Sequence, residues 1–105
     1  MSGVEMIRKE RSRQRRRTQN GEAYSLSNDD EHDRGELAAA AALYALPPEV
    51  RRRNHDLVDA LTPFGWYLKL ASNDRIRELE KAGALIAAEI DRLLRLEAKP
   101  EAPKP

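Results

Sequence analysis

Ser27 to Leu46, SNDDEHDRGELAAAAALYAL, joins a cluster of acidic residues and one histidine directly to an alanine-rich segment. Successive residues of a helix are about 100° apart, so one side of this segment would carry Asp29, His32, Asp33 and Glu36. The same side continues into the apolar residues Ala40, Leu43 and Tyr44. The pattern predicts a helix whose titratable groups point along the stripe that faces the core.

This helix is predicted over residues 28–46. Ser27 or Asn28 would cap its first backbone N–H groups, and the acidic residues that follow suit the positive end of the helix dipole. Pro47 ends it. Gly35 lies inside it, where glycine costs about 1 kcal/mol relative to alanine, which favours close approach of another group there.

Three further helices are predicted, over residues 4–17, 48–61 and 73–96. The first has few apolar residues and needs a partner surface to be stable. The last has a seam at spacings of three and four, formed by Ile76, Leu79, Gly83, Ile86, Ile90 and Leu93. Its small residues between 82 and 88 should let it cross the alanine run 38–42 closely. No strand pattern is visible, so the sequence predicts an all-α bundle of three to four helices.

The chain of 105 residues has room for one domain. We assign residues 1–19 to a basic N-terminal arm or marginal helix, 20–97 to the helical domain, and 98–105, AKPEAPKP, to a flexible Pro-rich tail. So small a core, without cysteine, favours homo-oligomerisation or docking on a partner. No apolar run is long enough to span a membrane and no secretory signal is visible, which indicates the cytoplasm.

The loop Phe64-Gly65-Trp66-Tyr67 concentrates the aromatic residues of the chain. One interpretation is a hydrophobic plug that covers the ends of the helices. The other is an anchor for a protein partner, because exposed Trp and Tyr are typical of interface hot spots.

Several motifs together resemble a family of small accessory proteins of tailed phages and prophages of Gram-negative bacteria. They are Glu10-Arg11-x-Arg13-Gln14, the segment from Asp29-Asp30-x-His32-x-x-Gly35-Glu36 to Tyr44-Ala45, and the segment from Leu79-x-Lys81-Ala82-Gly83 to Arg92-Leu93. The resemblance covers roughly residues 4–94 and implies a phage gene expressed in the cytoplasm of a bacterial host. The family has no established function as a whole. Its members often carry a histidine before the paired aspartates, where this chain has Asn28.

A divalent-metal site is one hypothesis for the acidic cluster. Asp29, His32, Asp33 and Glu36, completed by Glu89, offer oxygen and imidazole ligands suited to Mg²⁺ or Mn²⁺. The theme is similar to MazG-like pyrophosphatases, although their paired E-x-x-E and E-x-x-D elements are missing here. The alternative is structural: the aspartates serve the helix start, His32 pairs with Glu36, and Asp33 or Glu36 accepts hydrogen bonds from Arg11 or Arg13.

Nucleic-acid binding through the basic arm is a second hypothesis, with Arg13, Arg15, Arg16 and Arg17 as phosphate contacts and Arg51 to Arg53 beside them. Against it, the net charge is only +1 and no recognised DNA-binding motif is visible. His55 is expected to be a surface residue.

The favoured prediction is a non-enzymatic accessory protein that needs no cofactor and binds a host bacterial protein complex, with a defence or recombination system as the expected target. Its expected contact residues are Phe64, Trp66, Tyr67, Asp29, Asp30 and Glu36.

Overall fold

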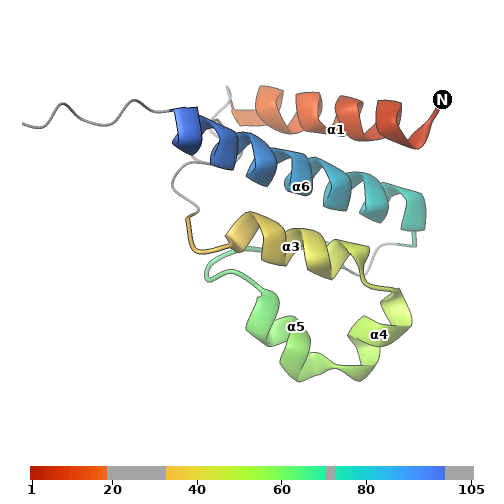
Figure 1. Cartoon of the computed structure of the whole chain (residues 1–105). Coiled ribbons are helices and arrows are strands. Elements are labelled where there is room, and N and C mark those ends of the chain that lie inside the picture. Colours follow the sequence, from red (N-terminus) through yellow and green to blue (C-terminus); the bar gives the residue numbers. More distant parts are fainter. Residues whose placement is uncertain (19–32, 71–72, 99–105) are drawn as a thin grey trace, which may run out of the picture.

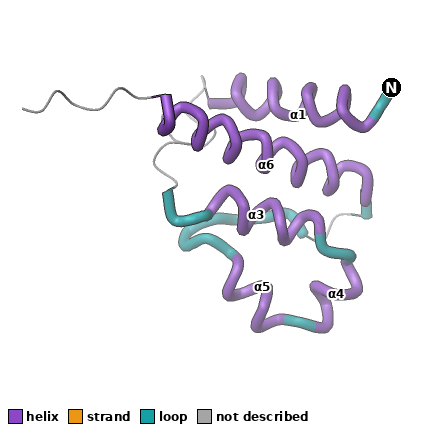
Figure 2. Tube along the Cα trace, in the orientation of Figure 1, coloured by secondary structure: helices purple, strands orange, loops and turns teal. Residues whose placement is uncertain are grey.

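The computed structural model describes residues 1–18, 33–70 and 73–98, apart from the side chains of residues 16–18. These ranges contain five helices and no strand (Figure 2). The helices are α1 (Gly3–Thr18), α3 (Glu36–Ala45), α4 (Pro48–Arg53), α5 (His55–Leu61) and α6 (Arg75–Ala98). The all-α class predicted from the sequence is confirmed.

The longest helix, α6, lies between α1 and α3 (Figure 1). α1 runs in the same direction as α6, and α3 runs in the opposite direction. α4 and α5 lie beyond α3, on the side away from α6. None of the described helices combines the length and the apolar character that crossing a bilayer requires.

The core forms where α3 and α6 cross. Its buried residues are Leu37, Ala40, Ala41 and Tyr44 from α3 and Ala82, Leu85 and Ala88 from α6. Trp66, Leu68 and Leu70 of the following loop pack against this cluster. Alanine faces alanine across the crossing, as predicted, because small side chains let two helix backbones approach closely.

The predicted seam of α6 faces away from this core. Its residues Ile76, Leu79, Ile86, Ile90 and Leu93 are between 44% and 61% exposed. The buried face instead consists of Glu78, Ala82, Ala84, Leu85, Ala88 and Arg92. The prediction was wrong because the charged side chains at both ends of this face find partners inside the fold, and such pairing lets a helix bury polar groups.

The predicted start of the alanine helix was also wrong. α3 begins at Glu36, and residues 33–35 form a turn in which Asp33 is exposed. Gly35 caps the helix at φ +81, and no group lies within 4 Å of the position of a Cβ there. Glycine is therefore favoured at this position by the left-handed backbone and not by a close approach. Residues 28–32 lie outside the described ranges.

Substituting Gly35 with alanine should lower the free energy of unfolding by about 1 kcal/mol, because L-residues rarely adopt positive φ. Urea denaturation measures the difference. Gly3→Ala is the matched control, since Gly3 lies at an open helical position. Equal stability of the two variants would contradict the left-handed cap.

The helix predicted over 48–61 is divided at Asn54. Its backbone leaves the helical region at φ −133 and ψ 62, so that α4 ends at Arg53 and α5 begins at His55. The Asn54 side chain donates a hydrogen bond to the carbonyl of Val50 at 2.8 Å. Asparagine commonly breaks helices in this way, because its amide competes with the backbone for hydrogen bonds. The bounds predicted for α1 and α6 are correct to within two residues.

Candidate functional site

A buried ion pair holds the C-terminal end of α3 in place. The Arg51 guanidinium lies 2.7 Å from the Glu78 carboxylate, and both side chains are almost completely buried. Arg51 also donates to the carbonyls of Leu43 and Leu46 at 3.0 Å and of Leu70 at 2.9 Å. The prediction that Arg51 belongs to a surface basic patch was therefore wrong: it joins α3, α4, α6 and the loop that carries the aromatic residues.

Arg75 binds the same helix end from the first turn of α6. It donates to the carbonyls of Tyr44 and Leu46 at 2.9 Å and lies 3.3 Å from Glu78. Cations are favourable there, because the last carbonyls of a helix lack partners and carry the negative end of its dipole. The two arginines and one glutamate thus join the C-terminal end of α3 to the place where the loop between α5 and α6 enters α6.

The aromatic loop is a tight turn with its rings on two sides. The Trp66 N–H donates to the Pro63 carbonyl at 3.0 Å, and Gly65 has φ +79, as a type II β-turn requires. Trp66 packs against the core, whereas Phe64 is fully exposed and Tyr67 is 87% exposed. Trp66 therefore fits the plug interpretation, whereas Phe64 and Tyr67 have the exposure that the anchor interpretation requires. We call Phe64 and Tyr67 the aromatic pair.

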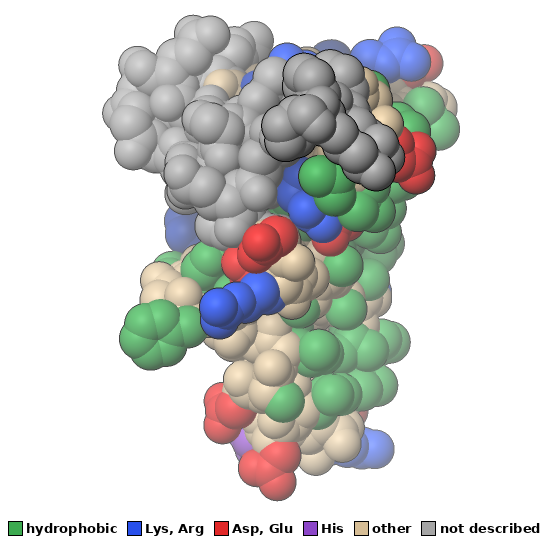
Figure 3. All heavy atoms as spheres, turned by 60° about the vertical axis from the view of Figure 1, so that its left-hand side comes forward, with side chains coloured by type: hydrophobic (Ala, Val, Ile, Leu, Met, Phe, Trp, Pro, Cys, Tyr) green, Lys and Arg blue, Asp and Glu red, His purple; other side chains and the backbone are tan. Residues whose placement is uncertain are grey.

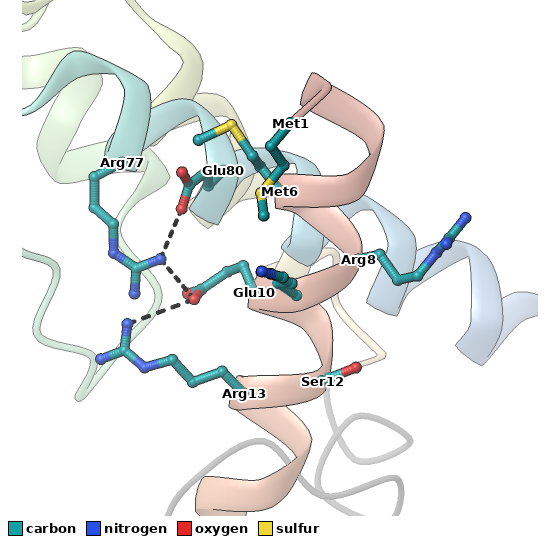
Figure 4. A pocket seen from close by; sticks show the side chains of 9 residues that line it. Met1, Met6, Arg8, Glu10, Ser12, Arg13, Arg77 and Glu80 are labelled. Carbon is teal, nitrogen blue, oxygen red and sulfur yellow. Dashed lines mark hydrogen bonds and ion pairs between the residues drawn. The ribbon is translucent and has the colours of Figure 1, made fainter.

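A cluster around Glu10 joins α1 to α6 (Figure 4). The Glu10 carboxylate is buried and lies 2.6 Å from Arg77 and 3.6 Å from Arg13, while Arg77 also reaches Glu80 at 3.0 Å. Gln14 donates to the second oxygen of Glu10 at 3.2 Å. Burial lowers the pKa of Arg77, but hydrogen bonds and charge attraction to both glutamates outweigh it and raise the pKa above its ordinary value.

Two hollows flank this Glu10 cluster and share Glu10, Arg13 and Arg77. One has a volume of about 620 Å³ and is lined by Met1, which precedes α1, and by Met6 and Arg8 of α1 (Figure 4). The other, about 400 Å³, is lined by Tyr44, Tyr67, Lys69, Lys81 and Leu85 in addition to the cluster. We call the second one the basic hollow.

The basic hollow brings four cationic side chains to one space, from α1, the loop and α6: Arg13, Lys69, Arg77 and Lys81. Glu10 is the acidic residue of its lining, so the cations are in excess. Tyr67 belongs to this lining and to the aromatic pair, which makes the two features neighbours. Such a site is chemically suited to a carboxylate or phosphate group beside an apolar contact. Sequence reasoning missed Lys69, Arg77 and Lys81, because no local spacing marks them.

The acidic cluster is only partly described. Asp29, Asp30 and His32 lie outside the described ranges. Glu36 is the first residue of α3, where its carboxylate accepts a hydrogen bond from the Arg34 N–H at 2.6 Å. Glu89 lies 2.5 Å from Arg92. Within residues 1–18, 33–70 and 73–98, no group of three or more His, Asp or Glu is arranged to hold a metal ion. The Mg²⁺ or Mn²⁺ site stays a prediction.

The arginines proposed for nucleic-acid binding are in different environments. Arg13 belongs to the Glu10 cluster, and Arg15 is exposed. The side chains of Arg16 and Arg17 lie outside the described ones. Beside the buried Arg51, Arg52 and Arg53 both pair with Glu49 on the surface. His55 is exposed, as expected.

The first helix docks on α6 through polar contacts, whereas the structural alternative expected Asp33 or Glu36 as the partners of Arg11 and Arg13. Arg11 lies 3.5 Å from Asp91, and Glu10 binds Arg77. Ile7 adds an apolar contact, because its side chain fills the space beside Gly83.

Replacing Glu10 with glutamine should lower the free energy of unfolding by about 1–2 kcal/mol, since a buried carboxylate is lost while water still reaches Arg77. Hydrogen exchange should show faster opening of α1 than of α3. Glu5→Gln is the control, because Glu5 is exposed on the same helix. Unchanged exchange in α1 would show that the Glu10 cluster does not hold it.

Comparison of the chain with protein-family models, with curated proteins and with solved structures finds no match. The resemblance to phage accessory proteins therefore remains a prediction that rests on the quoted motifs. Part of each motif has a structural role: Glu10 and Gln14 build the Glu10 cluster, and Leu37, Tyr44 and Leu85 belong to the core.

Proposed function

We propose that this protein is a non-enzymatic accessory protein that binds a host bacterial protein complex through the aromatic pair and the basic hollow. The observation that carries the proposal is the exposure of Phe64 and Tyr67 in and directly after a hydrogen-bonded turn. Folding gains nothing from a fully exposed phenylalanine, whereas binding gains much, because aromatic side chains bury a large area at little cost in conformational entropy.

The neighbouring charges indicate the chemistry of the partner surface. Lys69 and Lys81 line the hollow beside Tyr67, so an acidic residue of the partner would meet cations there. The matching surface is an apolar pocket that accepts Phe64, bordered by Asp or Glu side chains. Charge complementarity of this kind mainly raises the association rate and selects the partner.

The resemblance to phage proteins indicates where the proposed partner would be found. A phage-encoded protein in the bacterial cytoplasm encounters host machines, and a defence or recombination complex is the proposed target. Asp29, Asp30 and Glu36 remain proposed contacts.

The proposal is tested by cross-linking and capture in a Gram-negative host. A photo-reactive phenylalanine analogue at position 64 should cross-link to a defined host protein, and Phe64→Ser with Tyr67→Ser should weaken its capture at least about 30-fold, the loss of one strong hot spot. Leu57→Ser is the control, because Leu57 is an exposed apolar residue of α5.

Capture that survives the double substitution would refute a role of the aromatic pair. Hydrolysis of a nucleoside triphosphate with Mg²⁺ or Mn²⁺ would favour the MazG-like alternative instead. Salt-sensitive retention on duplex DNA that is lost on removal of residues 1–19 would favour the nucleic-acid alternative.

A further inference from the structure

The solvent face of α6 is aliphatic over most of its length. From Ile76 to Leu96, every exposed residue of α6 is isoleucine or leucine: Ile76, Leu79, Ile86, Ile90, Leu93, Leu94 and Leu96. Figure 3 shows hydrophobic side chains gathered in a long band on one side of the molecule. We define the α6 stripe as Ile76, Leu79, Gly83, Ile86, Ile90 and Leu93.

The charged side chains of the same stretch are turned toward the fold. Glu78 and Arg92 are buried, and Arg77, Glu80 and Asp91 are half-buried beside α1. A surface helix normally has the opposite arrangement. Contiguous exposed apolar residues of this extent mark a binding surface, because each one left in water forgoes the free energy of its burial.

The spacing of the stripe identifies the kind of partner. Its residues follow one another at intervals of three, four, three, four and three, the a and d positions of a heptad repeat. Ile7 of α1 lies over Gly83 and fills the place of the missing side chain. The stripe is therefore a coiled-coil seam whose central position, Gly83, is covered by Ile7 of α1, while its aliphatic residues are exposed among the described residues.

We propose that the α6 stripe pairs with the α6 stripe of a second copy of this chain, with the two helices antiparallel. In that orientation each a position meets a d position: Ile76 meets Leu93 of the second copy, Leu79 meets Ile90, and Gly83, with Ile7 over it, meets Ile86. All three layers fit one register, so the interface is self-complementary, as a two-fold dimer requires.

A parallel pair fits less well. It would place Gly83, with Ile7 over it, against the same two residues of the second copy in the middle of the seam, whereas the antiparallel pair places Ile86 there. The flanking charges also suit the antiparallel register, because Glu80 falls opposite Ala87 of the second copy and Glu89 opposite Ala82. No like charges face each other, and the two helix dipoles oppose one another.

The length and rigidity of α6 are sufficient for such a dimer. From Ile76 to Leu93 the stripe extends about 26 Å, or five helical turns. α1 and α3 already hold α6 in helical form on both flanks, so pairing orders little additional chain. The stripe does not include the aromatic pair, and a dimer would present that pair twice.

Analytical ultracentrifugation of the full chain tests the pairing. The wild type should sediment as twice 11.9 kDa at micromolar concentration. Ile86→Glu with Ile90→Glu should raise the dimer Kd at least about 100-fold, because the two-fold axis counts each substitution twice. The double variant Ile86→Ala with Ile90→Ala should raise the dimer Kd by a smaller factor. Circular dichroism should show that its helix content is unchanged. Leu57→Glu is the control and should leave the dimer intact.

Spin labels test the orientation. The chain has no cysteine, so one label can be placed at Glu97, an exposed residue beyond the stripe. The rise of 1.5 Å per residue predicts that the two labels lie about 38 Å apart in the antiparallel dimer and less than about 15 Å apart in a parallel one.

Loss of the dimer in the glutamate variant, with the long label distance in the wild type, supports the proposal. A monomeric wild type, a short label distance, or a dimer that tolerates both glutamates overturns it. A monomer destabilised by the alanine substitutions would show that a segment of the same chain covers the stripe. None of these results bears on capture of a host protein through Phe64, so the two proposals can fail separately.

Discussion

Replacing Arg51 with methionine is expected to lower the free energy of unfolding by about 3–5 kcal/mol, the cost of breaking a buried ion pair from one side. Glu78, which is 1% exposed, would lose its closest cation, and the carbonyls at the end of α3 would lose a donor. A domain of this size is stable by about 5–15 kcal/mol, so a large share of its stability would be lost. Urea unfolding followed by circular dichroism measures the change.

The control is the neighbouring residue. Arg52→Met removes an arginine that pairs with Glu49 on the surface, and it should change the stability by no more than about 0.5 kcal/mol. Adding Glu78→Gln to Arg51→Met should restore part of the lost stability, because an uncharged amide then replaces the carboxylate that lost its partner. Equal effects at positions 51 and 52 would show that the buried pair does not hold the fold.

Leu85→Ala should lower the free energy of unfolding by about 2–5 kcal/mol, because it opens a cavity where α3 and α6 cross. Leu85 is 1% exposed and belongs to the same buried cluster as Leu37 and Tyr44. The alanine residues of this cluster have side chains too short to fill the space. Thermal and urea unfolding both report this loss.

Ile86→Ala provides the comparison on the adjacent position. Ile86 is 48% exposed, and alanine is the better helix former, so the stability of the monomer should change by less than about 1 kcal/mol. The measurement is made below the concentration at which chains associate. A larger loss at Ile86 than at Leu85 would mean that α6 faces the core with the seam predicted from the sequence.

The two proposals concern different surfaces of one small molecule. Lys81 and Leu85 line the basic hollow beside Tyr67 and lie on the side of α6 turned away from the stripe. A dimer formed through the stripe would leave the aromatic pair free. Two linked copies would then engage a multi-subunit partner with higher avidity than one copy alone.

Local chemistry determined the helices that the sequence predicted correctly. Pro48 at a first turn, the alanine run before Pro47 and the long periodic segment after residue 73 each act within a few residues. The sequence also placed Phe64 to Tyr67 in a loop, and the structure adds that Gly65 there has positive φ. For that reason the sequence by itself determined the all-α class, most helix bounds and the candidate residues Phe64 and Tyr67.

Only the tertiary structure decided which face of α6 is buried. The helix has two apolar faces, one with Leu85 and one with the α6 stripe. The face with Leu85 is buried because Arg51, which is distant in sequence, neutralises Glu78 on that face. The basic hollow could not be predicted from the sequence either, because Arg13, Lys69 and Lys81 come from three segments that meet only after folding. Long-range pairing of charges, which no local pattern encodes, therefore set the interior and left a hydrophobic seam in water.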